Sequence, residues 1–284
     1  MNKFFVKTSA KVKEVLKTEV YFKGELEKEA SGLYTGSVEE NLPHGPGHLE
    51  LFNGSEYIGD FFEGKFHGKG VYTHIDGSRF QGTFENGEKI DPYPQVVIGN
   101  QIWMKKNLNV DKFRNGDPIP HIKSDKEWLK AGGEGKPAWC YYDNDPENGK
   151  KYGKLYNWFA VNDPRGLAPE GWHVASDDEW THLTDFLGGG EVAGTKIKSL
   201  NEWKNSFLNT DDYEYSALPS GKRYGYGDYD YIGNIGVWWS STEESAKYAW
   251  VRRLGNFKNM IRDPFEKRFG LSVRCVRDID YSVI

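Results

Sequence analysis

The segment from Leu33 to Ile90 matches itself when Tyr34 is placed on Tyr57 and Tyr57 on Phe80. The same shift superposes glycines, histidines and Gly-Ser pairs. The matched sets are Gly36, Gly59 and Gly82; His44 and His67; Gly45 and Gly68; Gly47 and Gly70; and Gly54-Ser55 and Gly77-Ser78. Self-similarity at a short fixed period indicates a repeat architecture, in which one unit cannot bury a face alone and neighbours must stack.

Each repeat unit predicts a β-hairpin. An aromatic-Xaa-Gly strand such as Tyr57–Phe61 is followed by a Gly-rich turn, a second strand such as Gly70–Thr73, and the turn pair Asp76-Gly77. Stacked hairpins give an elongated antiparallel sheet with aromatic side chains inside and charged side chains outside. The glycines supply turn geometry or allow close approach of the backbone.

Two runs carry a resemblance to a known repeat: Tyr57-Ile58-Gly59-Asp60-Phe61 and Gly64-Lys65-Phe66-His67-Gly68-Lys69-Gly70. They resemble the MORN repeat, with a degenerate first unit and a third unit that ends early at Phe84-Glu85-Asn86-Gly87. The resemblance implies a sheet that binds a protein partner or associates with itself. The recurring His44 and His67 could be metal ligands, but the repeat already accounts for them as turn residues.

Residues 1–32 precede the repeat, and we expect strands there that extend or cap the sheet. A short helix around Lys11–Lys17 is equally compatible with the sequence. After the repeat, Asp91-Pro92-Tyr93-Pro94 interrupts the pattern, because proline lacks an amide donor and restrains the residue before it. The predicted organisation is therefore a cap over 1–32, a repeat sheet over 33–91 and a second domain over 92–284.

The formal net charge of −5 leaves no basic field that could neutralise phosphates, so the sequence excludes nucleic acid as a partner. The apolar run within Met1–Lys7 is too short for a secretory signal, and no segment is long and apolar enough to span a membrane. Localisation stays open. The sequence is compatible with synthesis in the cytoplasm and display on a particle or cell surface by a non-classical route.

The second domain is predicted to mix strands and helices. The expected elements are a hairpin over Val96–Met104; a helix over Lys123–Lys130 with Ser124 and Glu127 as a capping box; a helix over Tyr152–Val161; a helix that begins after Ser176 and ends at Gly188-Gly189-Gly190; and strands over Val237–Thr242, Tyr248–Leu254 and Leu271–Val276. The chain between Gly190 and Val237 is predicted to be loop-rich. At least one of Trp238 and Trp239 is expected in the core.

Several motifs of this domain occur together in one known family. They are Gly99–Leu108, Tyr152–Trp158, Gly171–Trp180, Trp239–Glu243 and Gly270–Asp278. In this combination, residues 95–278 resemble the Fibrobacter succinogenes major paralogous domain. The resemblance implies the superfold of C-type lectins and the formylglycine-generating enzyme. This is an α+β fold with two main helices packed on a twisted, mostly antiparallel sheet and long loops on one side.

The residues do not support catalysis. The oxidase branch of the superfold depends on a closely spaced reactive cysteine pair, whereas Cys140 and Cys275 are widely separated and either pair or are buried thiols. Acidic clusters such as Asp143 with Asp145 are more typical of turns than of a glycosidase pair. We therefore predict no catalytic residue and no cofactor, with structural calcium on loop carboxylates as an open alternative. The calcium signature of sugar-binding C-type lectins is absent.

The stretch from Ser220 to Asn234 alternates tyrosine with glycine and aspartate. Tyrosine offers broad amphipathic contact with few rotamers to freeze, and glycine permits adaptable loops, a combination typical of binding surfaces. The predicted ligand-binding residues are Arg223, Tyr224, Tyr226, Asp228, Tyr229, Asp230, Tyr231 and Asn234. The alternative, that these tyrosines pack the stretch onto the domain, is equally compatible with the sequence.

Two functions are compatible with these features. The first is a non-enzymatic recognition or adhesion protein with a lectin-like head on a repeat stalk, binding a glycan or protein as part of a cell surface, a phage particle or an injection machine. The second is an intracellular scaffold that assembles proteins through the repeat sheet, with the head as a rigid block.

Overall fold

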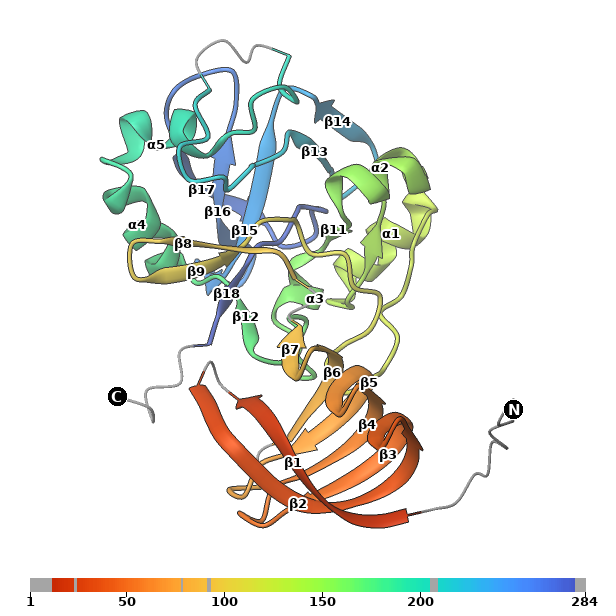
Figure 1. Ribbon diagram of the computed structural model, residues 1–284. Helices are drawn as coiled ribbons and strands as arrows, with labels where there is room; N and C mark the ends of the chain where they lie inside the picture. The colour runs from red at the N-terminus through yellow and green to blue at the C-terminus, as the bar shows by residue number, and fades with distance from the viewer. Residues whose placement is uncertain (1–11, 23–24, 78, 91–92, 205–208, 279–284) are drawn as a thin grey trace, which may run out of the picture. The chain divides into compact units, whose positions relative to one another are not determined.

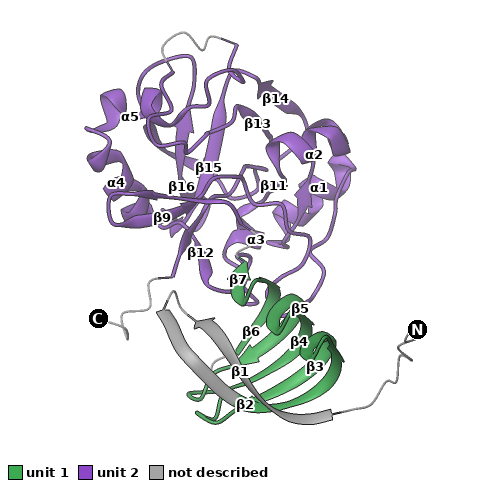
Figure 2. Cartoon of the chain, in the orientation of Figure 1, with its two compact units in different colours: residues 1–92 green, residues 93–284 purple. Residues whose placement is uncertain are grey.

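The structure is a computed structural model of the 284-residue chain. It describes residues 12–22, 25–77, 79–90, 93–204 and 209–278, and of residues 12–31 only the backbone. The chain forms two compact units, Met1–Pro92 and Tyr93–Ile284 (Figure 2). Each unit has its own sheets and its own buried core.

The first unit is an antiparallel sheet whose seven described strands follow one another in chain order (Figure 1). The strands are β1 (Val12–Phe22), β2 (Glu25–Glu39), β3 (Leu42–Leu51), β4 (Glu56–Phe62), β5 (Lys65–Thr73), β6 (Arg79–Glu85) and β7 (Glu88–Ile90). Every neighbouring pair is antiparallel, which confirms the predicted hairpin-repeat sheet. Where the sequence also allowed a short helix, the chain from Val12 onward is strand.

A row of glycines crosses the repeat sheet, one on each of the strands β2 to β6. In register order they are Gly36, Gly47, Gly59, Gly70 and Gly82. The Tyr57 side chain lies over two of them: a Cβ atom would come within 2.5 Å of its hydroxyl at Gly59 and within 2.3 Å at Gly70. Tyr34 covers the preceding glycine pair in the same way. The repeat therefore keeps glycine where an aromatic ring covers the backbone.

The aromatic rings of the repeat pack on one another to form the core of this unit. Tyr57 stacks on Phe66 with ring centroids 3.8 Å apart, and it meets Phe61 and Phe84 edge-on at 5.1 and 5.0 Å. The hydroxyl of Tyr57 donates to Asp60 O at 3.0 Å, so its polar end is satisfied inside the core. Buried rings in edge-on and stacked contact are the main stabilising feature of this sheet.

Gly70→Ala should destabilise the first unit by about 1–3 kcal/mol, because the new methyl group would collide with the Tyr57 side chain. Hydrogen–deuterium exchange of β4 and β5 measures this unit. Tryptophan fluorescence measures only the second unit, since the first tryptophan of the chain is Trp103. Exchange in β4 and β5 should accelerate while the urea midpoint of tryptophan fluorescence stays unchanged.

Gly77→Ala is the matched control, because a Cβ atom there meets nothing within 4 Å and costs only the strain of a left-handed backbone. Equal acceleration of exchange in both variants would contradict the explanation that ring cover requires glycine at position 70.

The second unit combines short sheets with short helices. Its five-stranded sheet has the order β14-β13-β15-β16-β17, its four-stranded sheet has the order β12-β18-β9-β8, and β10 pairs with β11. The strands are β8 (Gln95–Ile98), β9 (Gln101–Met104), β10 (Trp139–Cys140), β11 (Leu155–Tyr156), β12 (Trp172–Val174), β13 (Ser220–Arg223), β14 (Tyr229–Ile232), β15 (Gly236–Glu243), β16 (Tyr248–Leu254), β17 (Ile261–Glu266) and β18 (Cys275–Arg277). The predicted α+β class is confirmed, with more strand than helix.

The helices of this unit are short. They are α1 (Asp125–Gly133), α2 (Pro146–Tyr152), α3 (Trp158–Val161), α4 (Asp177–Phe186) and α5 (Gly190–Ile197), with the 3-10 turn η1 (Tyr142–Asn144). Ser176 with Glu179 forms the predicted reciprocal capping box on α4. Of the capping box predicted for α1, only the Ser124 half is present: its hydroxyl accepts from Glu127 N. Gly188 and Gly189 follow α4 with φ of +99° and +94°, the left-handed backbone that glycine tolerates.

Two predictions for this unit are wrong, the helix over Tyr152–Val161 and the strand over Leu271–Val276. The strand is not as long as predicted, because β18 begins only at Cys275. Tyr152–Val161 is not one helix, because Leu155–Tyr156 is strand β11 and α3 begins only at Trp158. Asn157 separates them, since its Oδ1 accepts from the backbone N–H of Ala160 as an N-cap. The described residues between Gly190 and Val237 are mostly loop, as predicted, but this stretch also holds α5, β13 and β14, and β17 is a further unpredicted strand. Strands β13 and β14 have only four residues each, which is too short for local periodicity to reveal them.

Strand β15 carries two tryptophans into two different parts of the core. Trp238 and Trp239 are both buried and belong to separate hydrophobic clusters, as expected for neighbours that point to opposite faces of a strand. Each indole N–H has a partner: Trp238 donates to Asn107 Oδ1 and Trp239 to Tyr156 O, both at 2.8 Å. At least one of these tryptophans is expected in the core, and both are there.

The two cysteines do not pair. Cys140 and Cys275 are free thiols buried in different hydrophobic clusters. Of the two alternatives that the sequence left open, the structure has the buried thiols.

His173 of β12 joins two carboxylates. Its Nε2 lies 2.6 Å from Glu179 Oε1 in α4, and its Nδ1 lies 2.6 Å from Asp278 Oδ1. The hydrogen bond with Glu179 and then the one with Asp278 raise the pKa of His173 to about 8, although burial opposes this. The imidazolium form, which donates from both nitrogens, satisfies both partners.

We expect the second unit to lose stability as the pH rises through about 8, because the folded-state pKa of His173 lies above its ordinary value of 6.5. The contribution should be complete below pH 6.5 and absent well above pH 8. Urea unfolding followed by tryptophan fluorescence across this range measures it. His173→Gln should remove the pH-dependent step; a step of undiminished size in this variant would mean that another group titrates.

Candidate ligand-binding site

The tyrosine-rich stretch forms an ordered β-hairpin. Strand β13 pairs antiparallel with β14, and β14 lies at the edge of the five-stranded sheet (Figure 1). Two backbone hydrogen bonds close the turn, from Tyr224 N to Asp228 O at 2.7 Å and from Gly227 N to Tyr224 O at 3.0 Å. The hairpin presents successive side chains to alternate faces.

Arg223 is fully buried beneath the hairpin. Its guanidinium donates to Gly227 O at 2.9 Å, Ile122 O at 2.7 Å, Lys123 O at 2.8 Å and Asp125 Oδ1 at 2.8 Å. The first acceptor belongs to the turn and the others to the start of α1, so Arg223 ties these two segments together. The prediction that Arg223 contacts a ligand is therefore corrected: its donors are used inside the fold, and it positions the hairpin.

Tyr229 also packs inward. Its ring centroid lies 5.3 Å from that of Tyr142, and its hydroxyl donates to Asn144 Oδ1 at 3.1 Å. Burial raises the pKa of Tyr229. This tyrosine packs the hairpin onto the domain, in the manner that the alternative interpretation of the sequence expects.

Tyr224, Tyr226 and Tyr231 form a second group, which we call the tyrosine face. Tyr226 is 53% exposed and stacks on Tyr224, with ring centroids 5.1 Å apart and planes inclined by 9°. Tyr231 is 39% exposed and has a φ of +71° within strand β14. These rings therefore lie at the surface of a hairpin whose base is fixed.

The remaining predicted residues lie around the tyrosine face. Asp228 is exposed at the turn, and Asp230 and Asn234 are partly buried. The Asp230 carboxylate accepts from Tyr231 N at 2.8 Å, and Asn234 N donates to Tyr231 O at 3.0 Å. Both contacts stabilise the unusual backbone of Tyr231.

Lys222 is a site residue that the sequence analysis missed. Its ammonium lies over four aromatic rings, with Nζ-to-centroid distances of 4.4 Å for Tyr224, 5.2 Å for Tyr231, 5.2 Å for Phe265 and 5.7 Å for Phe269. Burial lowers the pKa of Lys222. The two phenylalanines come from β17 and the turn after it, so only the folded chain brings them to β13. The one sequence signal is strand alternation, which places Lys222 on the face opposite Arg223.

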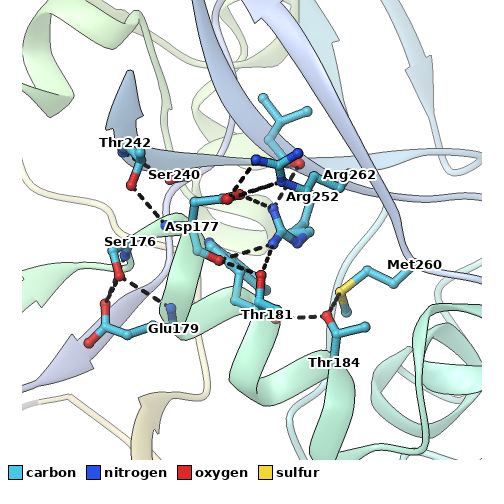
Figure 3. Close-up of polar contacts among 12 residues, drawn as sticks. Ser176, Asp177, Glu179, Thr181, Thr184, Ser240, Thr242, Arg252, Met260 and Arg262 are labelled. Atoms are coloured by element: carbon cyan, nitrogen blue, oxygen red, sulfur yellow. Dashed lines mark hydrogen bonds and ion pairs between the residues drawn. The ribbon is translucent and has the colours of Figure 1, made fainter. Parts of the chain in front are cut away.

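A second charged cluster links α4 to the strands beside it (Figure 3). Asp177 Oδ1 accepts from Arg252 Nη1 at 2.6 Å, and Arg262 Nη2 lies 2.9 Å from Asp177 Oδ2. Burial opposes ionisation of Asp177, but the hydrogen bonds from Arg262 and Arg252 hold its pKa below the ordinary value. Arg252 is itself buried and also donates to Thr181 Oγ1 at 2.9 Å. This cluster therefore stabilises the fold.

Neither a metal centre nor a reactive thiol is found in the described parts of the chain. No group of three or more His, Cys, Asp or Glu side chains there could hold a metal ion. Burial raises the pKa of the Cys140 thiol to about 11 and also raises that of Cys275, which disfavours the reactive thiolate. In the same residues, no helix has the length and apolar character needed to cross a membrane.

The fold thus defines a two-unit, β-rich protein in which a hairpin-repeat sheet precedes an α+β domain. The chain belongs to the Fibrobacter succinogenes major domain family, whose model matches residues 96–277. The MORN repeat matches at residues 34–56 and 57–79. Both resemblances seen in the sequence are confirmed. No curated protein is significantly similar to the chain.

Arg223→Ala should destabilise the second unit by about 1–3 kcal/mol, because it leaves the buried carbonyl group of Gly227 and the partly buried ones of Ile122 and Lys123 without their donor. Lys222→Met is the matched control one residue away: it removes the same charge but places an apolar chain among rings, and it should leave stability equal or slightly higher. Urea unfolding followed by tryptophan fluorescence measures both variants. Equal losses would contradict the assignment of Arg223 as the anchor.

Proposed function

We propose that the second unit is a non-enzymatic recognition domain that binds a glycan or protein ligand at the tyrosine face. The main observation in favour of this proposal is that one hairpin has both buried side chains, which hold it in place, and exposed aromatic rings. Arg223 and Tyr229 fix the hairpin, while Tyr226 and Tyr231 remain at the surface. Rings that are ordered before binding lose little conformational entropy when a ligand docks.

The chemistry of the tyrosine face supports binding. Burial, together with the hydrogen bond to Tyr231, raises the pKa of Tyr224 to about 12, so its hydroxyl, which is neutral near pH 7 in any case, stays neutral in alkaline solution as well. A neutral hydroxyl both donates and accepts hydrogen bonds, and the ring beside it supplies apolar contact area. The face therefore combines apolar contact with polar groups that can fix the orientation of a ligand.

The first unit supports a second role, contact with a protein partner or with a second copy of the chain. Its sheet exposes apolar side chains outside the aromatic core. They are Val38, Leu42, Ile58 and Phe62, which are between 39% and 48% exposed. Apolar groups at the surface of a folded sheet favour protein contact. If this sheet alone carries the function, the protein is an intracellular scaffold and the second unit is a rigid block.

The two functions differ in where the protein must be. Recognition as part of a cell surface, a phage particle or an injection machine requires display of the second unit, whereas the scaffold requires none. Labelling of intact cells or particles with an antibody supports recognition, and strictly cytosolic protein supports the scaffold.

Tyr226→Ala combined with Tyr231→Gly should weaken, by about 10-fold or more, the binding of any ligand found in a glycan and protein binding screen. Glycine suits the left-handed backbone at position 231, and the anchor residues are untouched, so the fold should persist. Phe186→Ala is the matched control, because Phe186 is a 51% exposed aromatic residue elsewhere on the unit. If every ligand binds the double variant as tightly as the unaltered protein, the tyrosine face is not the binding site.

A further inference from the structure

The ammonium of Lys222 has no direct anionic contact inside the described part of the protein. Among the described residues, its ammonium has ring contacts but no hydrogen bond or ion pair. Asp230 lies opposite it in the β13–β14 register, and its charge favours the ammonium form of Lys222, but the Asp230 carboxylate accepts from the backbone N–H of Tyr231 at 2.8 Å and forms no ion pair with Lys222. A partly buried cation without a direct ion pair or hydrogen bond is costly, because burial removes water that ring faces replace only in part.

The neighbouring cations do have partners. Arg253 Nη2 lies 2.9 Å from Asp263 Oδ2, and Arg268 Nε lies 2.5 Å from Glu266 Oε2. Unlike these two arginines, Lys222 has no direct ion pair with any residue that the structure describes.

The backbone at this edge disfavours an extended peptide as that ligand. A peptide that adds to a sheet needs a regular row of free backbone groups on the edge strand. Within β14, Tyr231 has a φ of +71°, which interrupts such a row. The accessible recognition elements are then ring faces, namely the parallel pair Tyr224–Tyr226 and Tyr231, arranged beside one ammonium.

We propose that the tyrosine face binds an acidic saccharide, with the ligand's carboxylate or sulfate group paired to Lys222 Nζ and a sugar ring lying on the exposed tyrosines. This inference rests on the proposed function and names the ligand class of the same site. The anionic group would give the ammonium a direct ion pair in addition to its ring contacts. The flat rings would take the apolar face of the sugar.

The test uses the full-length protein and measures dissociation constants by isothermal titration. The probes are a hexuronic acid trisaccharide, its neutral methyl ester, a sulfated disaccharide repeat oligomer and a poly-glutamate peptide. We expect an acidic sugar to bind about 10-fold or more tightly than its neutral counterpart, with affinity falling as salt rises. Lys222→Met should abolish this preference. Lys130→Met removes the same charge from a side chain that is 72% exposed on α1, and should keep it.

The outcomes separate this inference from the proposed function. Equal binding of acid and ester, or a preference that survives in Lys222→Met, overturns the acidic-saccharide assignment but leaves a tyrosine-dependent ligand intact. Binding of poly-glutamate alone through Lys222, or of no saccharide probe at all, also overturns it. If a ligand binds both Lys222→Met and the Tyr226/Tyr231 double variant with the same dissociation constant as the unaltered protein, the proposed site itself is wrong.

Discussion

The guanidinium of Arg223 is the contact on which the candidate site depends. It is fully buried, and its donors reach the hairpin turn and the two carbonyls that precede α1. Removing it would leave one buried and two partly buried carbonyl groups without a donor at once, so the cost is that of a network. Because this anchor lies on one face of β13, the opposite face is free to present Lys222 and the tyrosine face.

Buried cations stabilise other irregular segments of the second unit in the same way. Arg274 is completely buried and donates to Met104 O at 2.6 Å, Tyr215 O at 3.1 Å and Ser216 O at 3.2 Å. Lys198 donates to Gly255 O and Phe257 O, and burial lowers its pKa to about 8. Segments outside helices and sheets leave carbonyl groups without ladder partners, and one cationic side chain satisfies several of them. The first unit uses another solution, aromatic rings packed over a row of glycines.

The sequence predicts what local patterns control. The aromatic-Xaa-Gly repeat predicts the first sheet, and Ser176 with Glu179 predicts the start of α4, because both depend on residues close in the chain. The tyrosine-rich stretch identifies the hairpin, but it does not show which of its side chains are buried and which are exposed. Burial of Arg223 depends on Ile122 and Lys123, which are far away in sequence. Lys222 is not predicted for the same reason: the rings of Phe265 and Phe269 lie near its ammonium only in the folded chain.

Native-state amide hydrogen exchange of the full-length protein without ligand tests the central claim, that the hairpin is ordered before it meets a ligand. The informative amides are those of Arg223, Tyr224 and Gly227, which donate to Gly270 O, Asp228 O and Tyr224 O. A fixed hairpin predicts protection comparable to that of the core strand β15. Exchange of these amides at the rate of an unstructured loop would show that the rings are not preorganised, and would contradict the account.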